Sequence, residues 1–241
     1  MTPENPFQYW RPLAWTGPIL LVITIIFWGV FGHNIPPFSA DLTPDEFAAQ
    51  FRPLATQIRM GMIVTISFSV FYFTWGLAIT KVMETIERNN NVLSQCQLWG
   101  AGFTTLIFVI PCGIWIGATF RADTLDPATM QIIFDTGWII FDLAYSLTTL
   151  QMVAIGLCFL QDKRAVPLLP KWLCWFSIWV GLMFILEVLN PFFKGGNFSR
   201  SGLLNYWIEF SLFFAFMLLI SIWILKAITR LEQEYKAGQG A

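Results

Sequence analysis

The sequence predicts an all-α membrane protein, a bundle of six transmembrane helices in a single domain. Of the 241 residues, 56% are hydrophobic and only 12% are charged, whereas an ordinary soluble domain carries about a quarter charged residues. The apolar residues form runs of roughly the 20 residues that a hydrocarbon layer about 30 Å thick requires. Because a soluble protein with a large core does not need runs of that length, we expect residues 1–241 to form one transmembrane domain.

Six apolar runs of spanning length follow one another, separated by short polar segments. The predicted spans are residues 14–32, 58–80, 97–118, 131–158, 171–189 and 206–227. The first run begins after Arg11 and Pro12 without a following small-x-small cleavage site, so we expect a retained span rather than a cleaved signal peptide. The pair Pro36-Pro37 cannot continue a helix and marks the first loop.

Capping residues predict where several helices begin. Thr43-Pro44-Asp45-Glu46 has the pattern of a capping box, with the threonine as N-cap and the proline at the first helical position. The short amphipathic helix that it starts, residues 43–52, is predicted to lie on the outer membrane surface and to end at Pro53, where the second span begins. Two further caps are predicted, at Asp126 for the fourth span and at Ser201 for the sixth.

The distribution of Lys and Arg between the loops predicts the orientation, because these residues are enriched on the cytoplasmic side. One side carries nine of them: Arg11, Lys81, Arg88, Lys163, Arg164, Lys171, Lys226, Arg230 and Lys236. The other side carries five: Arg52, Arg59, Arg121, Lys194 and Arg200. An even number of spans then places both termini in the cytoplasm.

Four acidic residues interrupt the apolar runs. They are Asp135, Asp142, Glu187 and Glu209. A charged group near the bilayer centre costs at least about 2.5–3.5 kcal/mol. We therefore expect each of these side chains to face the bundle interior, to pair with a cation or to stay protonated.

The rise of the helix predicts the depth of each acid. Asp135 and Glu209 are expected roughly 12 Å from the outer ends of their spans, and Asp142 roughly 10 Å deeper, near the midplane. Glu187 is expected close to the outer end of the fifth span. Arg59 is the matching cation near the outer end of the second span.

On the fourth span, polar and aromatic residues recur at a spacing of three and four, which places them on one face of a helix. They are Asp135, Trp138, Asp142, Tyr145 and Thr149. We predict that this face lines a cavity that opens outward and narrows at Asp142, while Ile139 and Ile140 suit lipid or neighbouring helices. The 24 Phe and 12 Trp also suggest aromatic surfaces between helices. The predicted binding residues are Asp135, Trp138, Asp142, Tyr145, Glu187, Glu209 and Arg59.

The acids also have an interpretation without a ligand. In it they pair with Arg59, Arg121 or Arg200 and only lock the bundle together. No cation lies within predictable reach of Asp142, so this residue is the strongest functional candidate and the one candidate catalytic residue.

Several kinds of site are excluded. The single histidine, His33, rules out bis-His haem ligation and H-E-x-x-H zinc chemistry within one chain. There is no Walker loop, G-x-S-x-G, Gly-rich dinucleotide or aspartate-rich diphosphate motif, and no lysine lies mid-span for a retinal Schiff base. We therefore predict no cofactor and no metal. A net charge of −1 gives nucleic acid no basic surface.

Several motifs lie in and beside the loops. They are Thr43-Pro44-Asp45-Glu46-Phe47, the stretch from Ala55 to Met62, Asp162-Lys163-Arg164 with Pro167 to Trp172, and Pro191-Phe192-Phe193-Lys194 with Gly202-Leu203-Leu204. Together they resemble a family of small bacterial membrane proteins of unassigned function, over most of the chain. The resemblance implies six spans and a bacterial inner-membrane location, and it supplies no catalytic residues.

Three functions agree with these observations. The first is a small-molecule binding or transport protein with an outward-facing acidic and aromatic cavity. The second is an intramembrane enzyme for a terpenoid, sterol or other lipid, with Asp142 as general acid and Trp138 and Tyr145 stabilising positive charge. The third is an accessory subunit of a larger membrane complex. The expected partners are the bilayer, a small lipophilic or cationic ligand, and protein partners or a second copy of the chain.

Overall fold

The computed structural model describes residues 6–88 and 90–239, and in this part of the chain all regular structure is helical. The helices are α1 (Trp10–Ile23), the π-helix η1 (Thr24–Phe31), α2 (Pro44–Phe68), α3 (Val70–Glu87), α4 (Val92–Phe120), α5 (Pro127–Leu143), α6 (Tyr145–Leu160), α7 (Lys171–Met183), the 3₁₀-helix η2 (Phe184–Phe192), the π-helix η3 (Leu203–Ile208) and α8 (Glu209–Gln239). The predicted all-α class is confirmed.

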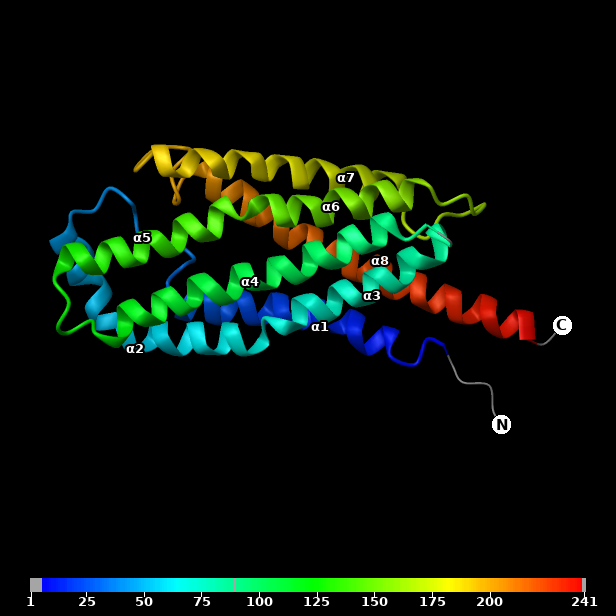
Figure 1. Ribbon diagram of the computed structural model, residues 1–241, viewed down its shortest axis with the longest axis horizontal. Coiled ribbons are helices and arrows are strands. Elements are labelled where there is room, and N and C mark those ends of the chain that lie inside the picture. Colours follow the sequence, from blue (N-terminus) through cyan, green and yellow to red (C-terminus); the bar gives the residue numbers. More distant parts are fainter. Residues whose placement is uncertain (1–5, 89, 240–241) are drawn as a thin grey trace.

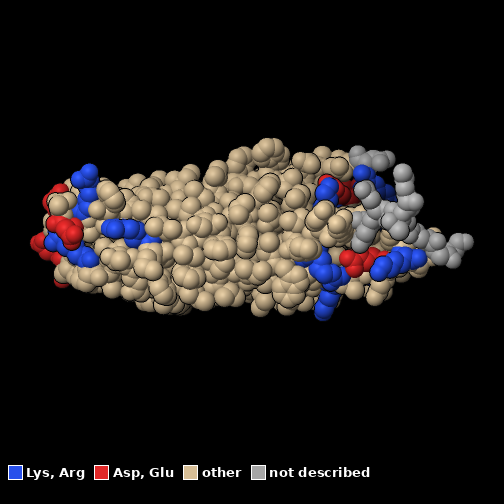
Figure 2. Space-filling model, turned by 90° about the horizontal axis from the view of Figure 1, so that it is seen from below, with Lys and Arg blue, Asp and Glu red and all other residues tan. Residues whose placement is uncertain are grey.

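Six helical stretches among the described residues are long and apolar enough to cross a membrane. They are Trp10–Phe31, Pro44–Glu87, Val92–Phe120, Pro127–Leu160, Lys171–Phe192 and Leu203–Gly238. Each overlaps one predicted span, so the structure agrees with six helices of spanning length, while the predicted span bounds and topology stay predictions. On the face shown in Figure 2, Lys, Arg, Asp and Glu gather at the two ends of the molecule and leave a broad uncharged band between them.

The helices run lengthwise and form a bundle with two distinct ends (Figure 1). At one end, here called the terminus end, α1 begins, α8 ends, and short connections join α3 to α4 and α6 to α7. The opposite end, here called the Arg200 end, holds the loops 32–43, 121–126 and 193–202. The expectation that the terminus end faces the cytoplasm rests on the Lys and Arg count alone.

The second span begins differently from the prediction. The capping box is confirmed, since Thr43 N donates to Glu46 Oε2 at 2.9 Å and Glu46 N donates to Thr43 Oγ1 at 3.4 Å. The predicted helix end at Pro53 is wrong, because α2 continues through this proline to Phe68. Figure 1 shows the first turns of α2 lying across the Arg200 end and the rest running along the bundle. An interfacial position for residues 43–52 stays a prediction.

Aromatic packing explains why α2 continues through the proline. Phe47 and Phe51 are fully buried and stack on each other with ring centroids 5.1 Å apart. Both rings also contact Phe134, at 5.1 and 5.6 Å. This packing holds the first turns of α2 against α5, so the proline bends the helix instead of ending it.

The two other predicted caps have opposite outcomes. Asp126 caps α5 as predicted, accepting a hydrogen bond from Thr129 N at 3.0 Å. Ser201 does not cap the sixth span, which begins with Gly202 at the N-cap and has no side-chain cap. A loop carbonyl replaces the cap: Asn197 O accepts hydrogen bonds from the backbone N–H groups of residues 204 and 205, at 3.0 and 3.2 Å.

Five spans of the described chain change their helical form partway along. The α-helix α1 passes into η1, and α7 passes into η2, while η3 passes into α8. A single residue separates α2 from α3, at Ser69, and α5 from α6, at Ala144. Inside a membrane, irregular backbone is tolerated where it is buried in protein or lines a cavity, and π segments are frequent at functional sites. The prediction treated each of these spans as one regular helix, and the break at Ala144 separates Tyr145 from the acids before it.

Candidate functional site

A small cavity lies inside the bundle, where the interrupted spans meet. Its volume is about 40 Å³, and its lining residues are Thr24, Trp28, Thr104, Ile107, Phe108, Phe141, Tyr145, Thr148, Phe184, Glu187, Phe210 and Phe213. Since one buried water needs roughly 10–15 Å³ of such volume, the cavity has room for about three waters or for a solute of a few non-hydrogen atoms. We call it the acidic pocket.

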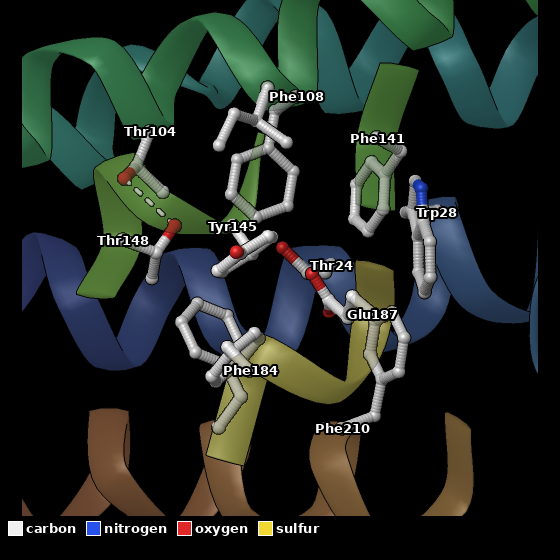
Figure 3. A pocket seen from close by; sticks show the side chains of 12 residues that line it. Thr24, Trp28, Thr104, Phe108, Phe141, Tyr145, Thr148, Phe184, Glu187 and Phe210 are labelled. Carbon is white, nitrogen blue, oxygen red and sulfur yellow. Dashed lines mark hydrogen bonds between the residues drawn. The ribbon is translucent and has the colours of Figure 1, made fainter. Parts of the chain in front are cut away.

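Glu187 supplies the only carboxyl group in the lining of this pocket. It lies on η2 and is buried, and it has no ion pair or hydrogen bond within the described part of the chain. Figure 3 shows its side chain in the middle of the pocket, with Thr24 beside it and Tyr145 across from it. The pocket therefore presents an acidic group surrounded by hydroxyl groups and aromatic rings.

Aromatic rings form most of the wall. The Trp28 ring stacks on Phe141 and on Phe210, with centroids 5.5 and 5.3 Å apart and 19° between the planes in both pairs. Phe184 meets Phe213 edge to face at 5.9 Å. The faces of aromatic rings carry negative potential and attract cations. The aromatic wall and the Glu187 carboxyl group therefore both favour a cationic ligand.

Two further carboxyl groups lie close to the pocket, on other helices. Asp142 on α5 and Glu209 at the start of α8 interact electrostatically with Glu187, and with each other. Asp142 is buried and accepts a hydrogen bond from Asn190 Nδ2. Glu209 is only 1% exposed, and both of its carboxyl oxygens lack a hydrogen-bond partner among the described residues. The structure thus brings together three of the four predicted acids.

More buried polar atoms near this cluster have no partner in the described structure. They are Trp28 Nε1, Trp138 Nε1, and both amide atoms of Asn205, which lies one helical turn before Glu209. The rings of Trp28 and Trp138 are 6.0 Å apart. Buried polar groups in proteins are nearly always hydrogen-bonded. These atoms therefore offer donors and acceptors to a bound solute.

Asp135, the fourth acid, has a different role. Its carboxylate is paired with Arg200, whose side chain is 3% exposed, while the side chain of Asp135 is 35% exposed. Arg200 also donates to Phe38 O at 2.8 Å and Ser39 O at 3.2 Å, and lies over the ring of Phe134 at 5.3 Å. The structure therefore agrees with the interpretation of Asp135 that involves no ligand. The contacts of Arg200 join loop 193–202 to loop 32–43 and to α5.

Arg59 does not serve as the balancing cation. It donates to Thr119 Oγ1 at 3.2 Å and to the Thr119 carbonyl, near the end of α4. Arg200 is the arginine that pairs with Asp135 and interacts electrostatically with Asp142. Arg59 thus helps to satisfy the last carbonyls of α4, which is a common use of arginine at a helix end.

The position of the pocket also differs from the predicted cavity. Of the predicted stripe on the fourth span, Tyr145 lines the pocket, whereas Asp135, Trp138, Asp142 and Thr149 do not. Ile139 and Ile140 are exposed, as their predicted lipid-facing positions require. The α5 residues of the stripe lie behind the pocket wall, because α5 turns the face with Phe141 toward the pocket instead.

A chain of aromatic contacts leads from the pocket toward the Arg200 end. Trp28 contacts Trp138, Trp138 contacts Trp115 at 5.4 Å, and Trp115 contacts Phe134 at 5.9 Å. Phe134 continues it into the packed rings of Phe38, Phe47 and Phe51. These fully or largely buried rings separate the pocket from the loops of this end. The sequence signalled them only as an excess of Phe and Trp.

Within the described residues, no group of three His, Cys, Asp or Glu side chains is arranged to hold a metal ion. The three clustered acids therefore do not form a three-ligand metal site. No protein-family model, curated protein or solved structure matches the chain. The resemblance to a bacterial membrane-protein family stays a prediction, and the function has to be argued from the pocket itself.

Proposed function

We propose that this chain is a multi-pass protein of the bacterial inner membrane that binds a small cationic solute in the acidic pocket and carries it across the bilayer. The observation that carries the proposal is the isolated carboxyl group of Glu187 inside an aromatic pocket, with Asp142 and Glu209 behind it. Intramembrane acids that face a bundle interior are the usual signature of ion or substrate pathways.

The charge balance of the site supports a cation. Arg200 pairs with Asp135, so it leaves the three clustered carboxyl groups without an ion pair in the described structure. Like charges that lie close together away from water disfavour one another strongly. A proton or a bound cation relieves this repulsion, and exchange of one for the other leaves the total charge unchanged. The pocket is therefore suited to a cation that replaces a proton.

The size of the pocket limits the solute. Room for about three waters in a cavity of about 40 Å³ suits ammonium or methylammonium, which also match the combination of ring faces and a carboxyl group. A sterol or terpenoid has many more non-hydrogen atoms than this volume holds, so the pocket gives less support to an enzyme for lipids.

The proposal includes access from the Arg200 end in a second conformation, because the packed aromatic rings close that side here. Residues of η1 and η2 line the pocket, and Tyr206 of η3 contacts Trp138 behind it. Discontinuous helices at a substrate site are a feature of several transporter folds. In the proposal they are the parts that move.

Binding is tested by the thermal stability of the purified protein in detergent. We expect methylammonium to raise the melting temperature, because a ligand at 100 times its Kd adds about 2.7 kcal/mol to the stability of a folded protein. Methanol, a neutral solute of the same heavy-atom count, is the control and should have no effect at equal concentration. Equal shifts with both solutes, or no shift with methylammonium up to 100 mM (about the highest useful level for a weak site), would contradict the proposal.

A further inference from the structure

Polar side chains continue from the acidic pocket toward the terminus end, between α3, α4 and α6. Three hydrogen-bonded pairs follow one another there, and all six residues are buried. Thr104 and Thr148, which also line the pocket, are 3.1 Å apart. The other pairs are Tyr72 with Gln151, whose phenol donates to the amide oxygen at 2.8 Å, and Thr80 with Gln97. We call these six residues the polar seam.

The close approach of the three helices sets the order of the pairs. A Cβ atom on Gly100 would lie 2.9 Å from the backbone nitrogen of Gln151, so α4 and α6 touch there. A Cβ atom on Gly76 would lie 2.5 Å from the Ala101 side chain, so α3 and α4 touch at the next residue of α4. On α3 the residues 72, 76 and 80 share one face, as residues three and four apart do on any helix. The three pairs therefore lie along the stretch where α3, α4 and α6 touch.

Beyond Gln97 the seam reaches the surface of the terminus end. Ser94 lies one turn earlier on α4 and is buried, and its backbone N–H donates to Glu87 Oε2 at 2.7 Å. Glu87 in turn lines a surface groove together with Asp162 and Arg164. Ser94 and Glu87 thus place polar groups between Gln97 and the surface of this end.

The seam also carries unused hydrogen-bond donors. The Nε2 atoms of Gln97 and Gln151 are buried and have no partner among the described residues. A purely structural pairing between helices leaves few such donors and contributes little stability in a membrane. Two amide groups with free donors at successive levels are what a chain of bound waters requires.

We infer that the polar seam is a hydrated route by which protons pass between the acidic pocket and the terminus end. The entry of a cation into the pocket, which this inference assumes, rests on the proposed function. When a cation enters the pocket, the Glu187 carboxyl group loses its proton. The O–H bond breaks with its electrons staying on the carboxylate oxygen. A water molecule accepts the proton, which leaves as hydronium through the seam. Asp142, Glu209 and Tyr145 are the titratable groups that face Glu187 from the other helices.

Hydration is tested first on the unchanged protein, by radiolytic footprinting with hydroxyl radicals generated from local water. We expect Tyr72 to be labelled although it is buried, and Phe216 to stay unlabelled, because this equally buried ring lies in the apolar core and has no polar atom that would hold a water. Labelling of Tyr72 at no more than the rate of Phe216 would overturn the inference without a variant that has to fold.

The route is tested next with Gln97→Leu and Gln151→Leu, and with Gln95→Leu as the matched control, since Gln95 is exposed on the same helix. In proteoliposomes with a pH-sensitive dye at the terminus end, methylammonium should release protons, and each seam variant should slow the release at least tenfold. The control should stay within twofold. If the melting shift with methylammonium persists while proton release is unchanged in the seam variants, the seam is overturned and the pocket survives. If the shift is absent in the wild type, the proposed function itself fails.

Discussion

Replacing Glu187 with Gln is expected to reduce the uptake of methylammonium at least 30-fold. The amide keeps the size of the side chain but loses the charge that faces the aromatic pocket. Truncating one partner of a buried charge pair costs about 2–5 kcal/mol, and about 1.4 kcal/mol corresponds to a tenfold change in affinity. The measurement is uptake of labelled methylammonium into proteoliposomes.

The fold should survive this change. Glu187 has no hydrogen bond to lose within the described chain, and a neutral amide is less costly to bury than an unpaired carboxylate. Glu84→Gln is the matched control, because Glu84 forms an ion pair with Lys81 at 2.8 Å on the partly exposed part of α3. Uptake that is equally high in both variants would show that the acidic pocket is not the binding site.

Asp142 allows a second variant of the same experiment. Asp142→Asn keeps a carbonyl oxygen that accepts the hydrogen bond from Asn190 and removes one of the three clustered charges. We expect it to abolish transport as well, with the fold intact. If Asp142→Asn transports normally while Glu187→Gln does not, the function is confined to the pocket wall and the charges behind it are structural.

The second large effect is on stability, at the ion pair of Arg200 with Asp135. Arg200→Ala is expected to lower the melting temperature by about 5–10 °C. Removing one partner of a buried ion pair costs about 3–5 kcal/mol. Screening of the 35% exposed Asp135 reduces this to about 2–3 kcal/mol, and 1 kcal/mol corresponds to roughly 2–4 °C in a chain of this size. The loss includes two hydrogen bonds to the backbone of loop 32–43.

Arg121→Ala is the control for this variant. Arg121 lies in a neighbouring loop of the same end, is exposed, and lies 5.9 Å from the Phe120 ring. Its removal should shift the melting temperature by less than about 2 °C, as expected for a surface substitution. Equal shifts for Arg121→Ala and Arg200→Ala would mean that the ion pair with Asp135 does not join the loops of this end. Thermal unfolding followed by tryptophan fluorescence gives both values.

The results expected for Glu187→Gln and for Arg200→Ala separate the acids by role. Asp135 belongs to the closure of the Arg200 end, because a buried arginine neutralises it. Glu187 lines the pocket among aromatic rings, and Asp142 and Glu209 interact with it from behind the wall. The same residue type at similar predicted depth thus serves packing in one place and, in our proposal, ligand binding in the other.

The membrane-spanning plan could be predicted from local sequence. A bilayer of roughly constant thickness requires runs of about 20 apolar residues, so six runs predict six spans whatever the packing. The caps at Thr43 and Asp126 were equally local, because each side chain bonds a backbone N–H only three residues away. Burial of Asp142, Glu187 and Glu209 followed from the cost of charge in lipid.

Only the tertiary structure decided which groups meet. Arg200 reaches Asp135 across 65 positions of the chain. The hydropathy of the sequence gives no reason to prefer Arg200 over Arg59 as the partner of this acid. The chain ends α5 at Ala144 without a proline or glycine to announce it, so the predicted stripe was assigned to a single face. The residues of the seam meet because Gly76 and Gly100 let separate helices touch. Such contacts depend on how whole helices pack, and no short segment of sequence encodes them.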